Sequence, residues 1–268
     1  MEKFKTSQKT VNPLFTYSVI PLALVLSYCL YEFVMGNPAN FIEGNPANNP
    51  LPENYLGIIY KGGIIVPVLI ANLLIVITFG IERLITIRKS RGRKPVDSFL
   101  TEIRSLLASG KFDQAKKACM DQKGSIANVI HEGLISYELM AKDQVQDKEH
   151  KIATIQKSIE ETTSLELPML SKNLSIISTI ASVATLLGLL GTVLGMVKAF
   201  AAMATAGAPD AVALANGISE ALINTALGVG TSALAIIMYN YFTTKIDSIT
   251  YGIDEAGYSV VQSFTSTH

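Results

Sequence analysis

The sequence reads Thr185-Leu-Leu-Gly-Leu-Leu-Gly-Thr-Val-Leu-Gly195 in one apolar segment and Gly217-Ile-Ser-Glu-Ala-Leu-Ile-Asn-Thr-Ala-Leu-Gly228 in a second. Both segments lie in apolar stretches of membrane-spanning length. Hydrocarbon tolerates polar side chains poorly, so a carboxylate, an amide and several hydroxyls there need a partner or a water-filled path. The two segments therefore indicate an ion-conducting membrane subunit rather than an enzyme.

The composition also indicates a membrane protein. Of the 268 residues, 49% are hydrophobic and only 16% are charged, and the mean hydropathy is +0.35, which argues against an ordinary soluble domain. Four stretches approach the roughly 20 apolar residues that cross a bilayer. We predict an all-α integral membrane protein with four transmembrane helices, at 14–35, 56–81, 173–204 and 213–244.

The basic residues of the flanking segments predict the orientation of these helices. Lys3, Lys5 and Lys9 lie in the tail 1–13, whereas the loop 36–55 contains no lysine or arginine. After the second span comes the strongest basic cluster of the chain: Arg83, Arg88, Lys89, Arg91, Arg93 and Lys94. Since basic segments stay in the cytoplasm, we expect the tail 1–13, the segment 82–172 and the tail 245–268 to be cytoplasmic. The loop 36–55 and the turn 205–212 are then periplasmic.

The loop 36–55 repeats one motif, Gly-Asn-Pro-Ala-Asn, at 36–40 and at 44–48. Asn-Pro and Gly break helices and favour turns. We expect a stiff external turn that joins two helices rather than a ligand site.

The segment 82–172 is predicted to be a set of short helices. An amphipathic pattern begins near Val96, Ser109-Gly110 stops the first helix, and Lys123-Gly124 separates the next two. We find no Gly-rich phosphate loop, no nucleophile beside a base and no metal-ligand spacing, so no cofactor, metal or nucleic acid is expected. Membrane lipids are expected partners of the basic run 88–94, whose main role is to set topology. From Lys151 the helical pattern is expected to continue unbroken into the third span, with a bend at Pro168.

The last two spans carry small, polar faces. Thr185 and Thr192 lie seven residues apart and project in nearly the same direction, as do Thr225 and Ser232. Glycines on these faces permit close packing of helices; they are Gly188, Gly191, Gly195 and Gly228. We predict that the last two spans line a central pore in a homo-oligomer, although a single hydroxyl can equally bond its own backbone.

Glu220 and Asn224 form an adjoining polar strip on the fourth span. A carboxylate inside a span is functional by default. However, Glu220 lies near the external end, where Lys198 is a plausible salt-bridge partner. We therefore keep two interpretations of Glu220, Lys198 and Asn224, a gate or assembly role and a structural ion pair.

The stretch 174–244 resembles the core of the MotA/TolQ/ExbB proton channel family, and it is most similar to the ExbB branch. The resemblance is carried by Leu186-Leu-Gly-Leu-Leu-Gly-Thr-Val-Leu-Gly-Met196 and Gly217-Ile-Ser-Glu-Ala-Leu222. Further similar segments, such as Ile81-Glu-Arg-Leu84, extend it to about residues 62–246. Two family prolines are absent, since Ala184-Thr185 and Ala233-Leu234-Ala235 stand at their positions. An additional helix precedes the usual three.

The resemblance implies a pentamer in the bacterial inner membrane that surrounds an ExbD-like dimer of single-span chains. It also implies that proton flow drives a TonB-like protein, which works on the outer membrane. By motif, Thr192 and Thr225 match hydroxyls that line the channel beside a protonatable aspartate of the partner, and Glu220 matches the family's glutamate. The alternatives are a TolQ-like or MotA-like energiser of another envelope process, and a non-conducting scaffold.

Overall fold

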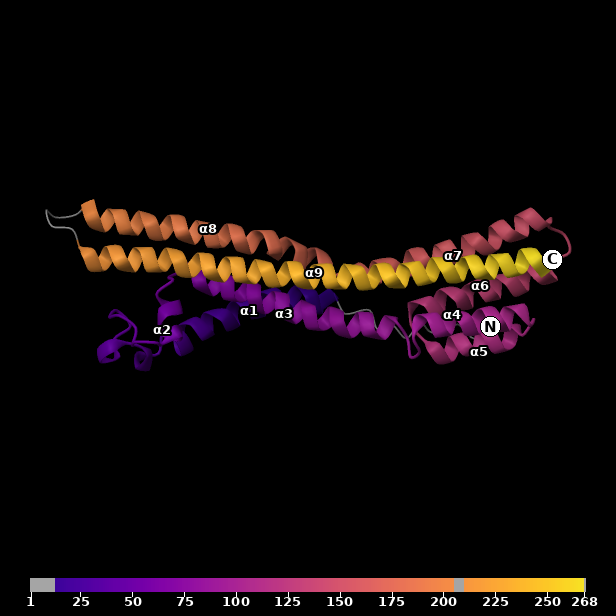
Figure 1. Ribbon diagram of the computed structural model, residues 1–268, viewed down its shortest axis with the longest axis horizontal. Coiled ribbons are helices and arrows are strands. Elements are labelled where there is room, and N and C mark those ends of the chain that lie inside the picture. The colour runs from indigo at the N-terminus through magenta and orange to yellow at the C-terminus, as the bar shows by residue number, and fades with distance from the viewer. Residues whose placement is uncertain (1–12, 205–209, 268) are drawn as a thin grey trace. The chain divides into compact units, whose positions relative to one another are not determined.

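The computed structural model describes residues 13–204 and 210–267 (Figure 1). The predicted tail 1–13, apart from Pro13, and most of the predicted turn 205–212 lie outside the described residues. Within those residues there is no β-strand, and four helices are long and apolar enough to cross a membrane. The prediction of an all-α membrane protein with four such helices is confirmed.

The elements follow one another along the chain as helices joined by short turns. The first half contains α1 (Pro13–Cys29), the π-helical turn η1 (Leu30–Met35), the 3-10 turns η2 (Pro38–Asn40) and η3 (Ile42–Gly44), α2 (Tyr55–Tyr60), α3 (Ile65–Ser90), α4 (Val96–Ala108) and α5 (Phe112–Gln122). The second half contains α6 (Ser125–Lys142), α7 (Lys148–Ser171), α8 (Leu174–Ala204) and α9 (Ala211–Thr267).

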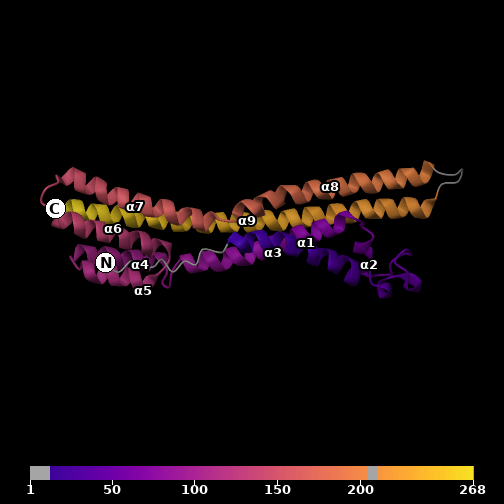
Figure 2. The ribbon, with the colours of Figure 1, turned by 180° about the vertical axis from the view of Figure 1, so that it is seen from behind.

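The chain divides into two compact units, each built from separate stretches of sequence. Among the described residues, the spanning unit holds 13–81, 173–204 and 210–240, and the bundle unit holds 82–172 and 241–267. In the spanning unit α8 and α9 lie side by side, as both ribbon views show (Figures 1 and 2).

The bundle unit forms around a core of apolar side chains from its short helices. Phe99, Ile103 and Leu107 recur at helical spacing on α4, and all three are buried. The buried ring of Tyr137 on α6 packs against Phe112, with ring centroids 4.5 Å apart, and against Phe264 near the end of α9, at 4.9 Å. Helix breaks lie at Ser109-Gly110 and at Lys123-Gly124, where the sequence predicts them.

The repeated Asn-Pro-Ala motif of the loop forms the same local turn twice. Asn37 Oδ1 accepts a hydrogen bond from the backbone N–H of Ala39 at 3.0 Å, and Asn45 Oδ1 accepts one from Ala47 at 2.9 Å. Lys61 Nζ donates to the carbonyls of Pro46 and Ala47, each at 2.9 Å. These bonds tie the loop to the chain after α2, as expected of a stiff turn.

Two predicted continuous helices are interrupted in the structure. The span predicted at 56–81 is broken between α2 and α3, where Gly63 adopts a φ of +76°. The helix predicted to continue from Lys151 into the third span ends at Ser171, and Asn173 adopts a φ of +64°. Pro168 lies inside α7 and does not end it. Gly and Asn tolerate this left-handed conformation, so each break has a residue that permits it.

The segment 245–268, predicted to be a cytoplasmic tail, is helical as far as it is described. It continues α9, a single helix of 57 residues. Phe264 and Val260 of this stretch are fully buried in the bundle unit. The end of the chain therefore contributes to the core of the bundle.

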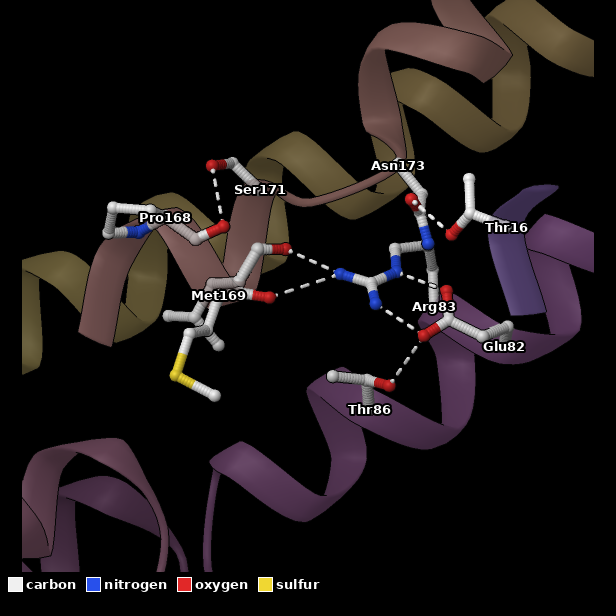
Figure 3. A network of polar contacts seen from close by, with 9 residues as sticks. Thr16, Glu82, Arg83, Thr86, Pro168, Met169, Ser171 and Asn173 are labelled. Atoms are coloured by element: carbon white, nitrogen blue, oxygen red, sulfur yellow. Dashed lines mark hydrogen bonds and ion pairs between the residues drawn. The ribbon is translucent and has the colours of Figure 1, made fainter. Parts of the chain in front are cut away.

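Arg83, one of the basic residues that predict the topology, is fully buried in the bundle unit. Its Nη1 donates to the carbonyls of Met169 and Leu170 at 3.2 and 3.1 Å (Figure 3). Its Nε donates to Glu82 Oε2 at 2.6 Å, and its Nη2 pairs with Glu82 Oε1. The last carbonyls of a helix have no partner within it. Arg83 therefore caps the end of α7 and joins it to α3.

Candidate channel-lining site

Glycines allow the backbones of α8 and α9 to approach closely in the spanning unit. A Cβ atom on Gly188 would lie 3.0 Å from the carbonyl oxygen of Asn224, and one on Gly195 would lie 2.7 Å from that of Gly217. A Cβ atom on Gly228 would lie 2.6 Å from the carbonyl oxygen of Ala184. Gly191 faces the side chain of Asn224. The structure therefore places all four glycines named from the sequence at the α8–α9 contact.

Gly217 belongs to the same contact and was missed in the sequence analysis. A Cβ atom there would lie 2.8 Å from both Cβ and N of Ala199. Gly217 and Gly228 are eleven residues apart, a spacing that returns to nearly the same face of an α-helix. This spacing could have identified Gly217 as a packing residue from the sequence.

Thr192 and Thr225 meet across this contact. Their hydroxyl oxygens form a hydrogen bond in which either can donate. Thr192 Oγ1 also lies 3.2 Å from the carbonyl oxygen of Gly188 and 3.4 Å from that of Ala221. A hydroxyl has one proton and two acceptor lone pairs, so Thr192 can make only one of these donations at a time. The pair therefore retains capacity to bond a further polar group.

The two other predicted lining residues have different surroundings. Ser232 is buried, and its hydroxyl donates to the carbonyl of Ala181 on α8. Thr185 is exposed on α8 and makes no side-chain hydrogen bond to another described residue. Ser232 thus ties α9 to α8, while the hydroxyl of Thr185 is open on the surface of this single chain.

Glu220 and Lys198 form an ion pair between α9 and α8, with Nζ and Oε1 2.5 Å apart. The Glu220 side chain is only 12% exposed, whereas that of Lys198 is 59% exposed. A Cβ atom on Gly63 would lie 2.6 Å from Glu220 Oε1. The carboxylate therefore packs directly against the break between α2 and α3, and only glycine leaves room for it there.

Asn224, one helical turn after Glu220 on α9, contacts the same break between α2 and α3. Its side chain is fully buried, and its Nδ2 donates to the carbonyl of Gly62 at 2.8 Å. Its Oδ1 is buried without a hydrogen-bond partner among the described residues. Glu220 and Asn224 thus contact the consecutive glycines at positions 62 and 63, and both act on the α2–α3 turn within the spanning unit.

Thr192 and Thr225 lie in stretches of α8 and α9 that contain no charged residue. No Asp, Glu, Lys or Arg lies between Glu220 and Lys245 or between Lys172 and Lys198. Hydroxyls can donate to and accept from a water molecule or a carboxyl group, but they do not titrate near neutral pH. A proton path along this surface therefore needs a titrating group from outside these stretches.

The fold and the site define a multi-pass, all-α membrane protein with a polar contact between two long apolar helices. A model of the MotA/TolQ/ExbB proton channel family matches residues 122–255. The chain belongs to this family. A comparison with curated proteins found no match.

Proposed function

We propose that this chain is an ExbB-like channel subunit, not an enzyme, of the bacterial inner membrane. Together with an ExbD-like single-span partner it converts proton motive force into mechanical work on a TonB-like protein. The observation that carries this proposal is the hydrogen-bonded pair of Thr192 and Thr225 on the α8–α9 contact. The chain belongs to a family of proton channels, and the apolar stretches that carry these two threonines contain no carboxylate.

The missing acid supports a partner in the channel. In the proposal a carboxyl group of the partner reaches the threonine pair, and the hydroxyls bond it in both its protonated and its ionised form. Each proton that crosses the membrane releases about 2.3 kcal/mol per 100 mV of membrane potential. Several protons in each cycle are then sufficient for a conformational step.

The apolar surfaces of the two long helices support a homo-oligomer, which we propose to be a pentamer. In the single chain many large apolar side chains of α8 and α9 are exposed; they include Leu186, Leu189, Val193, Val197, Leu222, Val229, Ile236 and Ile237. Lipid and further copies of the chain are the apolar surroundings available to them. The basic flanks favour a cytoplasmic location for both termini and for the segment 82–172.

Reconstitution with a single-span protein encoded beside this chain tests the proposal. Liposomes that contain both proteins should conduct protons under an applied potential, and replacement of the partner's membrane aspartate with asparagine should abolish the flux. A complex that assembles fully but conducts no protons would show a scaffold instead.

The ExbB-like assignment needs a second readout in cells. Deletion of the gene should stop uptake through TonB-dependent outer-membrane receptors. Normal uptake with defective envelope constriction would favour the TolQ-like alternative, and a loss of motility alone would favour the MotA-like one.

A further inference from the structure

The last turn of α3 and the segment between α3 and α4 expose four basic side chains without acidic partners. Arg88, Lys89, Arg91 and Arg93 are all exposed, and none forms an ion pair with another residue in the described part of the chain. Lys94 differs, because its Nζ pairs with Glu102 at 2.6 Å. Asp97 is the only acid between positions 88 and 97. We call Arg88, Lys89, Arg91 and Arg93 the basic turn.

A buried glutamine holds the basic turn in one conformation. Gln122 is only 2% exposed, and its Oε1 accepts a hydrogen bond from the backbone N–H of Lys94 at 2.9 Å. Its Nε2 donates to the carbonyl of Lys94 at 3.0 Å, and its own carbonyl accepts from the N–H of Arg93 at 2.9 Å. The backbone that carries Arg91 and Arg93 is therefore fixed from inside the protein.

Two glycines make this close packing possible. Gly92 and Gly124 have φ values of +81° and +89°. A Cβ atom on Gly92 would lie 2.5 Å from Gln122 Nε2 and from the carbonyl oxygen of Lys123. A turn that only had to remain cytoplasmic would need its charges but not this fixed backbone, because topology depends on charge and not on conformation.

The length of α3 places the basic turn at the depth of lipid headgroups. Apolar side chains occupy the outward surface of α3 as far as Ile85, which is 60% exposed. The apolar run of α3 ends at Ile81, just before Glu82 and Arg83, and from Ile65 to Ile81 the helix rises about 24 Å, most of the thickness of the bilayer hydrocarbon. Arg88 follows about 10 Å further along α3, in the headgroup layer.

We propose that the basic turn is a preformed binding site for an anionic phospholipid. Lipid surrounds the chain at this depth, and guanidinium groups bind phosphate oxygens through paired hydrogen bonds. Arg91 and Arg93 bind the headgroup phosphate, while Arg88 and Lys89 add charge on the last turn of α3. The ligand is a lipid whose headgroup carries a phosphate and a net negative charge. This inference rests on the membrane span and is independent of proton conduction.

Native mass spectrometry of the purified assembly tests the site by titration with phosphatidylglycerol and phosphatidylcholine. The unmodified protein should bind the first phosphatidylglycerol more tightly than phosphatidylcholine. R91Q/R93Q should weaken phosphatidylglycerol binding by roughly fivefold for each residue replaced, the effect of one cation at a membrane surface. K111Q/K117Q is the matched control, because it removes the same charge from two exposed lysines of the bundle unit.

Gln122→Ala distinguishes a preformed site from nonspecific electrostatic attraction. The substitution keeps every charge but removes the side-chain hydrogen bonds that fix the backbone of the basic turn. We expect it to lose most of the preference for phosphatidylglycerol. If Q122A folds and binds as the unmodified protein does, the site is not preformed and the proposal fails. If Q122A does not fold, the comparison of R91Q/R93Q with K111Q/K117Q still tests the proposal. Equal losses of phosphatidylglycerol affinity in these two variants would refute the site.

Two further outcomes would also overturn the proposal. If inorganic phosphate displaces phosphatidylglycerol at equal concentration, the turn binds free phosphate rather than lipid. If R91Q/R93Q changes the oligomeric state and leaves lipid affinity unchanged, the basic turn contacts another copy of the chain.

Discussion

Two polar clusters of this chain contrast in how completely their groups are bonded. In the bundle unit Arg83 is fully buried, and its guanidinium is bonded by a carboxylate and two carbonyls. In the spanning unit Thr192 and Thr225 are half-buried and share one hydrogen bond. The first cluster carries charge that is neutralised in place, whereas the second carries no charge and has spare bonding capacity.

The difference indicates which cluster is structural and which is suited to conduction. A buried charge is stable only when it is paired and hydrogen-bonded, so the Arg83 cluster is expected to stay fixed. Hydroxyls exchange partners at low cost, because each can donate or accept. A proton path needs groups of the second kind, and helix anchoring needs groups of the first.

Replacement of Arg83 should have the largest effect on stability. Arg83→Met removes the donor of two helix-end carbonyls and the cationic partner of the Glu82 carboxylate, which keeps only neutral donors such as Thr86. Removal of one partner of a buried pair typically costs about 3–5 kcal/mol. We expect a large loss of folded protein after extraction and a lower midpoint of thermal unfolding.

The matched control for Arg83 is the exposed ion pair of Arg104 and Glu255, 2.6 Å apart. Its side chains are 49% and 32% exposed, so Arg104→Gln should cost less than about 1 kcal/mol. Equal losses in R83M and R104Q would contradict the structural role assigned to Arg83.

A glycine pair on α9 tests the packing around the threonine site. Gly228→Ala forces a methyl group against the backbone of α8 and should cost about 1–3 kcal/mol. Gly230→Ala introduces the same methyl group into open space and should be neutral or slightly stabilising, since alanine favours the helix. Thermal unfolding of both variants checks this, and a tolerated G228A would mean that α8 and α9 are not in close contact.

The ion pair of Glu220 and Lys198 should contribute modestly, about 1 kcal/mol or less, because Lys198 is mostly exposed. If the pair only braces the α2–α3 turn, E220Q and K198M should each raise hydrogen exchange at residues 61–64 and leave proton flux unchanged. Flux that changes in E220Q with unaltered exchange would instead assign Glu220 to a gate.

The smallest effect is expected at Glu138 in the bundle unit. Lys116 and Lys142 donate to its carboxylate at 2.6 and 2.7 Å, and these bonds lower the Glu138 pKa from 4.5 to about 2. A lowered pKa in the folded state gives stability that is present above pH 4.5 and is lost as the pH falls towards 2. The midpoint difference between the unmodified protein and E138Q should therefore be small at pH 7 and shrink below pH 4.5. A difference that grows on acidification would refute this.

The sequence was most informative where one local signal decides the structure. Helix breaks at Ser109-Gly110 and Lys123-Gly124, and the small face of α8, follow from residue type and period. The breaks at Gly63 and Asn173 were missed because the apolar pattern continues across them. Each depends on a tertiary contact, through Asn224 for the first and through the capping of α7 by Arg83 for the second.

Arg83 also shows that the position of a charged residue in the sequence does not predict whether its side chain is buried. It lies near five other basic residues, and counting them predicts the topology but not the burial of any one of them. Its carbonyl partners lie 86 and 87 residues away along the chain, so no local pattern reveals its burial. The contact of Thr192 with Thr225 was easier to predict, because both residues lie on the faces of adjacent helices that carry small residues.

Proton flux through the reconstituted complex, measured after removal of one hydroxyl at a time, tests whether Thr192 and Thr225 line the proton path. T192V and T225V should each assemble normally and lower the flux by about tenfold or more, since one hydrogen bond to the path is lost. T192S should restore it, and T179V, which removes only a bond to the Ser175 carbonyl, should conduct normally. Unchanged flux in T192V and T225V would contradict the account.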